Sequence, residues 1–327
     1  MKFPDFMESK NSDIIRAKAF LEQGALVAIP TETVYGLAAN GTSKAAIQGI
    51  YSAKGRPSNN PLILHFPNLK AIQPFVDSIS EEVQLLADAF WPGPLTLLLP
   101  KSDKVLDIVT AGLPRVAVRV PNHPKTLELL AQLDFPLAAP SANPSGYISP
   151  TQASHVEQQL GNKIAMVLDG GACQKGLEST ILGWDDQGQP IIYRKGVITA
   201  EAIEKVLHKL PQNHKAKTLE APGMLSLHNA PNTKTIVSAQ IKQVLTEHAK
   251  KTIGLISFQQ HYSTKLKGIS EEITLSISGS LEEVAQKLNA AMHTMDLLGL
   301  DIIIIEKVPE TGVGKAINDR LTRSMSQ

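Results

Sequence analysis

The sequence predicts an α/β protein of two domains, and three observations support this prediction. The chain has 327 residues, whereas a single hydrophobic core rarely serves more than about 250–300. Apolar runs of strand length alternate with helical patterns along most of the chain. Residues 211–233 break this alternation, because they contain prolines and have no helical period. We therefore predict a first domain at 1–210, a linker at 211–233 and a small domain at 234–327.

Composition and charge narrow the class of protein. Apolar residues make up 43% of the chain, which is sufficient for a packed core. The 32 Lys and Arg nearly balance the 31 Asp and Glu, so any basic site must be local. No apolar run approaches the roughly 18 residues of a membrane helix, so we expect no membrane partner and no secretory signal. The single cysteine, Cys173, excludes an internal disulfide, and we expect a reducing compartment, the cytoplasm.

The elements of the first domain follow from apolar periodicity and from residues that start or stop helices. Ser12 or Asn11 is expected to cap the first helix and Ser43 the second, which Gly55 ends in a left-handed conformation. Ser149 is expected to cap a later helix. Helices are predicted over residues 12–24, 43–55, 80–91, 123–133, 149–161 and 199–210, and strands over residues 25–30, 61–66, 94–100, 115–121, 135–140, 164–171, 178–184 and 190–196.

The small domain alternates strands and helices in the same way. This succession implies a mainly parallel, Rossmann-like α/β sheet. Ser280 and Glu283 form a capping box at the start of its longest helix. Strands are predicted over residues 234–239, 252–258, 272–277 and 300–308, and helices over residues 240–251, 280–299 and 314–325.

Several common binding motifs are absent from the sequence. The segment GVGKA, Gly312 to Ala316, only approximates a phosphate-binding loop, because its glycines are two residues apart and alanine replaces the hydroxyl residue. We interpret it as a turn that leads into a helix. The nine histidines are scattered and lack the spacing of zinc ligands, so no metal site held by the protein is predicted.

Polar side chains gather in turns at the ends of two buried strands. Thr31, Glu32 and Thr33 follow the first strand, and Ser141 and Asn143 follow a later one. Ligands of open α/β sheets usually bind at strand ends. Ordinary turn chemistry would explain each turn alone, but their recurrence favours a binding site.

Cations accompany these turns. Lys54 and Arg56 flank a glycine that ends a helix, Arg115 and Arg119 share one face of a strand, and Arg194 ends another strand. They are either solvated surface charges or ligands of a phosphate or carboxylate, for which the arginine fork is well suited. The dipole of the helix that ends there would by itself favour Lys54.

These residues lie in segments that resemble a known family. The first domain contains, in the order of the YrdC-like domain, the segments PTETVYGL, AKGRPSNNPLILH, WPGPLTLLL, AGLPRVAVRVPNHP, APSANPSG, SPT, DGG, ESTI and YRKG. The later segments APGM, HNAP and DRLTR resemble the long, two-domain threonylcarbamoyl-AMP synthases. The resemblance covers nearly the whole chain and implies a twisted mixed sheet with flanking helices for the first domain. The K-x-R and S-x-N signatures of the family fall on Lys54 with Arg56 and on Ser141 with Asn143.

The resemblance implies a nucleotidyltransferase that serves tRNA modification. Such an enzyme condenses L-threonine, bicarbonate and ATP, with Mg²⁺, into threonylcarbamoyl-AMP and releases pyrophosphate. Downstream proteins then transfer the threonylcarbamoyl group to adenosine 37 of tRNA, and tRNA itself is a candidate partner. The reaction needs positioned reactants and cations to offset the phosphate charges, and it needs no protein nucleophile.

The resemblance also assigns roles to residues. Lys54 and Arg56 would be catalytic, with Lys54 at the phosphates of ATP. The threonine side would be lined by Thr31, His65, Arg119, Ala139 and Ser179, and the ATP side by Arg56, Asn60, Arg115, Ser141, Asn143, Ser149 and Arg194.

The linker departs from the family pattern. Members of the family usually carry basic and aromatic residues between PGM and AP, but this chain has LSLHN, Leu225 to Asn229. His228 is retained, whereas asparagine occupies the tyrosine position. If the linker closes over the nucleotide as a lid, the resemblance does not extend to a nucleotide contact from residue 229.

Two further interpretations remain open, one for the cations and one for residues 234–327. The cations could belong to an RNA-binding module that recognises folded tRNA or double-stranded RNA by shape, although the near-zero net charge and the lack of an RNP aromatic motif oppose this. Residues 234–327 contain no acid–base pair, and we expect a regulatory, lid-anchoring or partner-binding role for them.

Overall fold

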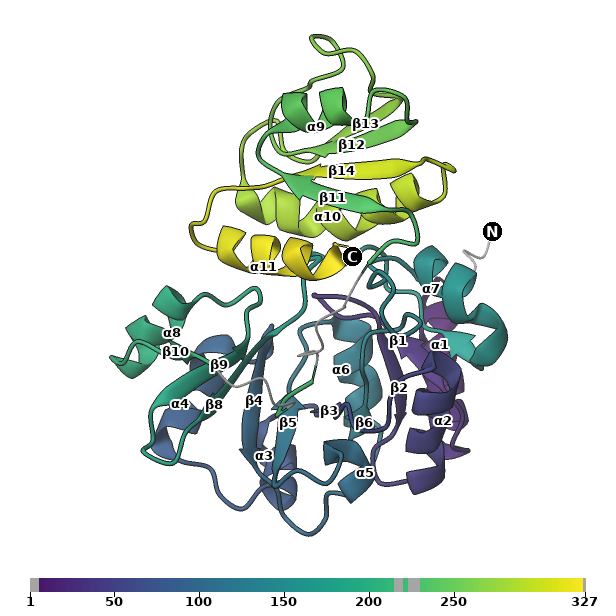
Figure 1. Ribbon diagram of the computed structural model, residues 1–327. Coiled ribbons are helices and arrows are strands. Elements are labelled where there is room, and N and C mark those ends of the chain that lie inside the picture. Colours follow the sequence, from purple (N-terminus) through teal and green to yellow (C-terminus); the bar gives the residue numbers. More distant parts are fainter. Residues whose placement is uncertain (1–5, 215–219, 223–229, 326–327) are drawn as a thin grey trace.

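A computed structural model describes residues 6–214, 220–222 and 230–325. It contains a ten-stranded sheet and a four-stranded sheet, which come from the earlier and the later part of the chain (Figure 1). The larger sheet mixes parallel and antiparallel pairs, and every pair in the smaller sheet is parallel. The expected mixed sheet followed by a small parallel α/β sheet is confirmed.

The larger sheet is built from short strands. Their order across the sheet is β10 (Gln212–Asn213), β9 (Pro190–Arg194), β8 (Thr180–Trp184), β4 (Leu95–Pro100), β5 (Arg115–Arg119), β3 (Ile63–His65), β6 (Leu137–Ala138), β2 (Gly36–Asn40), β1 (Val27–Ile29) and β7 (Met166–Val167). The helices of this part are α1 (Phe6–Glu22), α2 (Lys44–Lys54), α3 (Leu69–Ile72), α4 (Glu81–Phe90), α5 (Asp107–Thr110), α6 (Pro124–Ala131), α7 (Ala153–Leu160) and α8 (Ala200–Leu207).

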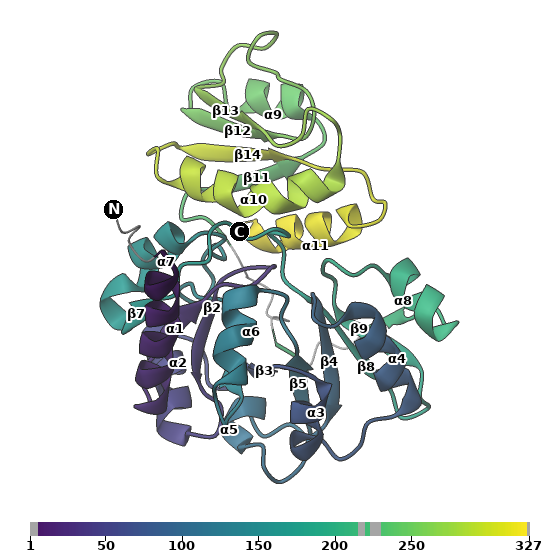
Figure 2. The same ribbon diagram turned by 180° about the vertical axis from the view of Figure 1, so that it is seen from behind.

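Strand alternation divides the apolar side chains between the two faces of this sheet. In β1, Val27 and Ile29 pack with α1 and α6, which Figure 2 shows together on one side, whereas Ala28 packs into the cluster that contains α2. In β5, Val116 and Val118 belong to the cluster that contains α2. Arg115 and Arg119 therefore project from the opposite face of β5.

The smaller sheet forms a layer between helices. Its order is β11 (Thr235–Ser238), β14 (Ile302–Glu306), β12 (Ile253–Ser257) and β13 (Glu271–Thr274), and its helices are α9 (Ile241–Glu247), α10 (Leu281–Asp296) and α11 (Gly314–Ser324). Helix α9 covers one face, and α10 and α11 lie on the other, between the two sheets (Figures 1 and 2). The core around α10 and α11 includes Ile148 and Leu177 of the earlier part of the chain, so a single apolar cluster crosses the interface.

Several local predictions are confirmed. Ser43 caps α2 by accepting a hydrogen bond from Ala46 N, and Gly55 ends this helix in the left-handed region at φ 61°. Ser280 caps α10 by accepting from Glu283 N. The return half of that capping box is missing, because the Glu283 carboxylate accepts from serine hydroxyls instead.

Other local predictions are wrong. The first helix begins at Phe6 rather than at Ser12. Ser149 is no helix cap, because its buried hydroxyl donates to the Glu178 carboxylate and α7 begins only at Ala153. Strand β2 had not been predicted, and β10 falls inside the stretch assigned to the linker. The altered linker positions, 225–229, lie outside the described residues.

Among the residues that the structure describes, no helix has the length and apolar character to cross a membrane.

Candidate active site

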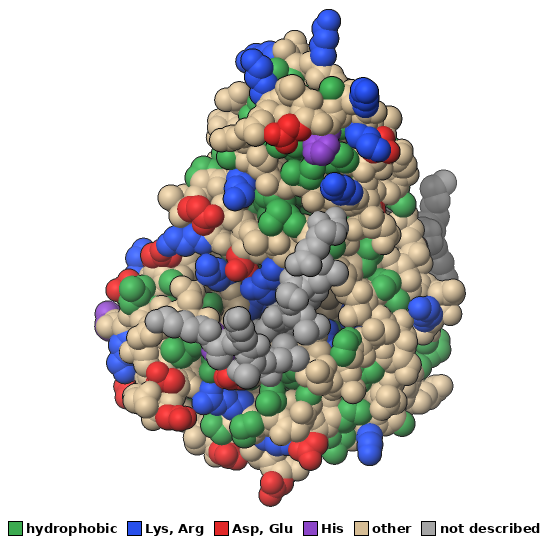
Figure 3. All heavy atoms as spheres, in the orientation of Figure 1, with side chains coloured by type: hydrophobic (Ala, Val, Ile, Leu, Met, Phe, Trp, Pro, Cys, Tyr) green, Lys and Arg blue, Asp and Glu red, His purple; other side chains and the backbone are tan. Residues whose placement is uncertain are grey.

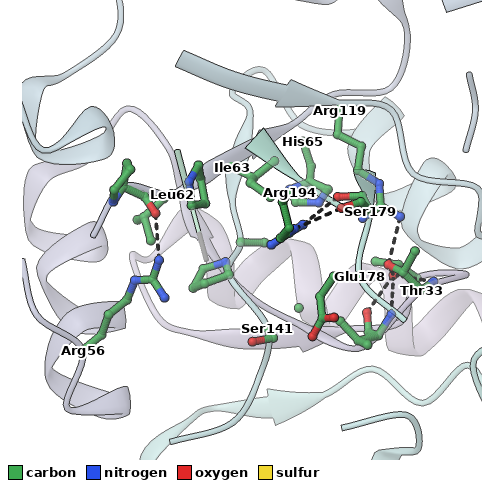
Figure 4. A pocket seen from close by; sticks show the side chains of 17 residues that line it. Thr33, Arg56, Leu62, Ile63, His65, Arg119, Ser141, Glu178, Ser179 and Arg194 are labelled. Carbon is green, nitrogen blue, oxygen red and sulfur yellow. Dashed lines mark hydrogen bonds between the residues drawn. The ribbon is translucent and has the colours of Figure 1, made fainter. Parts of the chain in front are cut away.

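A pocket opens on the face of the larger sheet from which Arg119 projects (Figure 4). Its walls come from the ends of β3, β5 and β9 and from the turns beside β1, β6 and β8. The residues that line it are Thr31, Thr33, Val34, Gly36, Arg56, Pro61, Leu62, Ile63, His65, Arg119, Ala139, Pro140, Ser141, Glu178, Ser179, Arg194 and Pro222.

Arg119, at the end of β5, is 4% exposed, and three of its five N–H groups donate to the protein. Its Nη2 donates to Glu32 Oε1 at 2.7 Å and to Thr33 Oγ1 at 3.0 Å, and its Nε donates to Gly93 O at 3.2 Å. The second carboxylate oxygen of Glu32 accepts from Asn122 N at 2.9 Å. The charge of Arg119 is therefore offset by a buried carboxylate, and its Nη1 keeps no protein partner among the described residues.

Arg194, at the end of β9, is held by one residue. Its Nε donates to Ser179 O at 3.0 Å and its Nη2 to Ser179 Oγ at 2.9 Å. The pKa of Arg194 is lowered to about 9, chiefly by burial and then by the charges of Arg119, Arg323 and Arg56. No carboxylate in the described part of the chain forms an ion pair with Arg194.

Arg56, just beyond α2, is fixed in a similar way. Its Nε donates to Asn60 O at 3.2 Å, and its Nη2 donates to Asn60 Oδ1 at 2.6 Å and to Pro61 O at 2.8 Å. Its pKa is lowered to about 10, chiefly by burial. Arg56 likewise has no carboxylate partner among the residues described.

The three arginines share one arrangement. In each guanidinium, Nε and Nη2 donate to the protein, while Nη1 is left without a protein acceptor in the described structure. Figure 4 shows Arg56 at one end of the pocket, Arg119 toward the other and Arg194 between them. The pocket thus presents three oriented cationic groups, and within the described part of the chain only Arg119 is paired with an acid.

His65 neighbours Arg119, because the two residues are register partners in the parallel pair of β3 and β5. The side chain of His65 is buried, and its pKa is lowered to about 3, first by burial and then by the charge of Arg119. His65 is therefore uncharged at neutral pH and contributes a polar but neutral group to the pocket.

Lys54 lies behind the pocket wall. Its Nζ donates to Ser141 O at 2.6 Å and to Asn143 O, so it ties the end of α2 to the turn after β6. Burial, and then the charge of Arg56, holds the pKa of Lys54 well below its usual range. Lys54 therefore does not line the rim of the pocket beside Arg56, because buried backbone carbonyls hold its ammonium group away from the opening.

Two family models match the chain. The model described as "Telomere recombination" matches residues 19–196, and the model described as "Threonylcarbamoyl-AMP synthase, C-terminal domain" matches residues 198–326. The chain belongs to the two-domain threonylcarbamoyl-AMP synthase family. The resemblance seen in the sequence is confirmed, and the protein is an enzyme of the nucleotidyltransferase type.

Relatives within the threonylcarbamoyl-AMP synthase family match along nearly their full length. The threonylcarbamoyl-AMP synthase of Pyrococcus abyssi is 38% identical in an alignment that covers 94% of this chain and 92% of that protein. The threonylcarbamoyl-AMP synthase of Bacillus subtilis is also 38% identical, and its alignment covers 98% of this chain and 95% of that protein. The crystal structure of P. abyssi Sua5 complexed with L-threonine superposes with a TM-score of 0.89, over 96% of this chain and 94% of that chain.

The structure brings together eight of the residues predicted for the site. The following eight residues line the pocket described above: Thr31, Arg56, His65, Arg119, Ala139, Ser141, Ser179 and Arg194. Their roles in binding threonine or ATP stay predictions.

Five predicted site residues lie outside this pocket. Lys54 lies behind its wall, and Asn60 orients Arg56 from outside it. Asn143 donates through Nδ2 to two backbone carbonyls, and Ser149 donates to a carboxylate. Arg115 lines a separate hollow, where its Nη1 donates to a tyrosine hydroxyl at 2.8 Å.

Two acidic residues at the site were not assigned a role from the sequence. Glu32 stands among the polar residues of the first turn, but nothing in the sequence indicates Arg119 as its partner. Glu178 lines the pocket and pairs with Arg320 of α11, so the smaller domain reaches the pocket wall. The only sequence signal for Glu178 was its place in the family segment ESTI.

Proposed function

We propose that this enzyme forms threonylcarbamoyl-AMP and pyrophosphate from L-threonine, bicarbonate and ATP. We further propose that downstream proteins in the cytoplasm use the product to modify adenosine 37 of tRNA. The names of the full-length relatives support the reaction, and the crystal structure of a relative complexed with L-threonine supports the amino acid substrate.

The observation that carries this proposal is the charge of the pocket. Arg56 and Arg194 are both half-buried, and neither has a carboxylate partner among the described residues. A buried cation without a counter-charge is costly, so the site favours an anion that brings the missing charge. The triphosphate of ATP is such an anion, and guanidinium groups suit phosphate oxygens.

The other end of the pocket suits an amino acid. Arg119 offers the two N–H groups of Nη1 to a carboxylate, and the neutral His65 adds a polar group without adding charge. Thr31, Ala139 and Ser179 supply the small mixed surroundings that a threonine side chain requires. The placement of Arg56 and Arg119 at opposite ends favours ATP and threonine side by side.

The chemistry asks for positioning rather than for a protein nucleophile. The neutral threonine amine forms a C–N bond to the carbon of bicarbonate, from which one water leaves, or to the carbon of CO₂, in which case the amine loses one proton. An oxygen of the resulting carbamate then attacks the α-phosphorus of ATP, and the bond from that phosphorus to pyrophosphate breaks. Arg56 and Arg194 would offset the charge that moves onto the leaving pyrophosphate.

Magnesium is proposed only as the ion that accompanies ATP. In the described part of the chain, no three His, Cys, Asp or Glu side chains come together as a metal site. An ion bound chiefly through phosphate oxygens needs no such cluster.

The experiment measures pyrophosphate release in the presence of ATP, L-threonine, bicarbonate and Mg²⁺, and identifies threonylcarbamoyl-AMP by mass spectrometry. We expect release that depends on threonine and bicarbonate and that is strongly reduced in Arg56→Ala. Arg16→Ala, which removes an exposed arginine on α1, serves as the control and should leave the rate unchanged. Release that ignores threonine, or equal rates for the wild type and Arg56→Ala, would reject the proposal.

The alternative of an RNA-binding module is not favoured. Arg119 is 4% exposed inside a pocket, where a folded RNA could not reach it. On the face shown in Figure 3, basic and acidic side chains are interspersed, whereas backbone recognition of RNA needs a basic patch or stripe.

A further inference from the structure

The buried ion pair between Glu32 and Arg119 is the feature that the proposed reaction does not yet explain. The side chains of Glu32 and Arg119 are 3% and 5% exposed, and Glu32 does not line the pocket. Each oxygen of the Glu32 carboxylate has its own donor, Arg119 Nη2 at 2.7 Å and Asn122 N at 2.9 Å. The carboxylate is therefore fixed in position and faces Arg119 rather than a ligand.

The hydrogen bonds around Arg119 run in one direction. The Thr31 hydroxyl donates its proton to Val34 O at 2.7 Å, so in its 2.8 Å contact with Thr33 it must accept. Thr33 Oγ1 then accepts from Arg119 Nη2 at 3.0 Å. A chain of donors leads from Arg119 through Thr33 and Thr31 to a backbone carbonyl, and it orders a turn that lines the pocket.

Counting the donors of Arg119 shows what remains for a ligand. A guanidinium has five N–H groups. Nε uses one on Gly93 O, and Nη2 uses its two on Glu32 and Thr33. Only the two N–H groups of Nη1 are left without a partner in the described structure.

We infer that Glu32 is a positioning residue: it holds the Arg119 guanidinium so that Nη1 alone faces the carboxylate of the amino acid substrate. This inference rests on the proposed function, since it concerns the threonine end of the same pocket. Glu32 also offsets the charge of Arg119, so the substrate carboxylate meets an oriented donor pair whose charge is already balanced. The unbalanced charges, Arg56 and Arg194, are left for the phosphates.

The test is Glu32→Gln in the full-length protein, with the affinities for L-threonine and for ATP measured separately by calorimetry. In Gln an NH₂ group replaces one of the two carboxylate oxygens, so either Arg119 Nη2 or Asn122 N would face a donor instead of an acceptor. We expect the threonine dissociation constant to rise roughly 10- to 100-fold, as when a partner that orients a metal ligand is removed. The ATP dissociation constant should change less than about twofold, because Arg56 and Arg194 do not contact Glu32.

A double-mutant cycle tests whether Glu32 acts through Arg119. In an Arg119→Ala background, Glu32→Gln should have no further effect on threonine affinity. Glu82→Gln is the matched control, because its carboxylate pairs with Lys209 and accepts from Trp184 outside the pocket. If Glu32→Gln does not fold, Glu32→Asp, which keeps the charge but withdraws it by one methylene, is judged by the same two affinities.

Three results would overturn the inference. They are unchanged threonine affinity in Glu32→Gln, an equal loss of threonine and ATP affinity, and a further loss of the same size in the Arg119→Ala background. Failure of the wild-type protein to bind threonine would instead reject the proposed function, and the inference with it.

Discussion

Removal of the Arg320 side chain should destabilise the protein far more than removal of another cation on the same helix. Arg320 of α11 pairs with Glu178 across the domain interface, and the two side chains are 8% and 10% exposed. Arg320→Ala removes the Arg320 guanidinium from its ion pair with the buried Glu178 carboxylate, to which Ser149 still donates. Breaking a buried pair on one side typically costs about 3–5 kcal/mol of unfolding free energy.

Lys315 provides the control on the same helix. It pairs with Glu201 of the first domain, but these side chains are 45% and 50% exposed. Exposed pairs contribute about 0–1 kcal/mol, so Lys315→Ala should change the unfolding free energy by no more than that. Urea denaturation followed by circular dichroism measures both variants against the wild type.

The double variant Arg320→Met with Glu178→Gln tests whether the loss of stability in Arg320→Ala comes from the charge left on Glu178. It removes both charges, and it also removes the buried Arg320 Nη1, which has no hydrogen-bond partner among the described residues. Neutral replacement of a buried pair is often harmless or stabilising, so most of the stability should return. If Arg320→Ala costs no more than Lys315→Ala, the argument from burial is refuted.

Three further predictions concern the site, the interface and one turn. Arg194→Gln should weaken ATP binding about 10- to 100-fold, because hydrogen bonds to charged groups contribute about 1.5–3 kcal/mol, and unchanged calorimetric affinity would contradict this. His293, buried with its ring 4.1 Å from that of His155, has a pKa lowered from 6.5 to about 4, chiefly by burial. Because folding favours the neutral His293 ring, its contribution to the unfolding free energy is complete above pH 6.5 and is smaller by about 2 kcal/mol at pH 5. In urea titrations, His293→Gln should abolish this loss. Gly55→Ala should cost about 1 kcal/mol through its φ of 61° alone, since no atom lies within 4 Å of the added carbon, and Gly55→Asn should cost less in the same titration.

The sequence alone determined most of the local structure. Ser43 and Gly55 bound α2 as predicted, because capping depends on hydrogen bonds within one turn of the chain. The alternation of β5 also placed Arg115 and Arg119 on one face, since side chains repeat every two residues along a strand. The family segments added the location of the pocket and eight of the residues that line it.

Tertiary structure decided which groups meet. Ser149 precedes a proline and resembles a helix cap, yet its hydroxyl is used by Glu178, a residue brought close only by folding. Arg115 and Arg119 share a face but lie roughly 13 Å apart along the strand, so they line different hollows.

The contrast between local sequence and tertiary contacts also explains Lys54 and Arg56, which flank Gly55. The sequence placed Lys54 on the last turn of α2 and Arg56 beyond it, and both positions are as predicted. The direction of each side chain depends on its acceptors. Lys54 donates to backbone carbonyls of the turn after β6, far along the chain, whereas Arg56 donates to the nearby Asn60 and Pro61 and stays at the pocket. Local sequence fixes a residue's place on its own helix or strand, but a buried charge points toward whichever groups the completed fold provides.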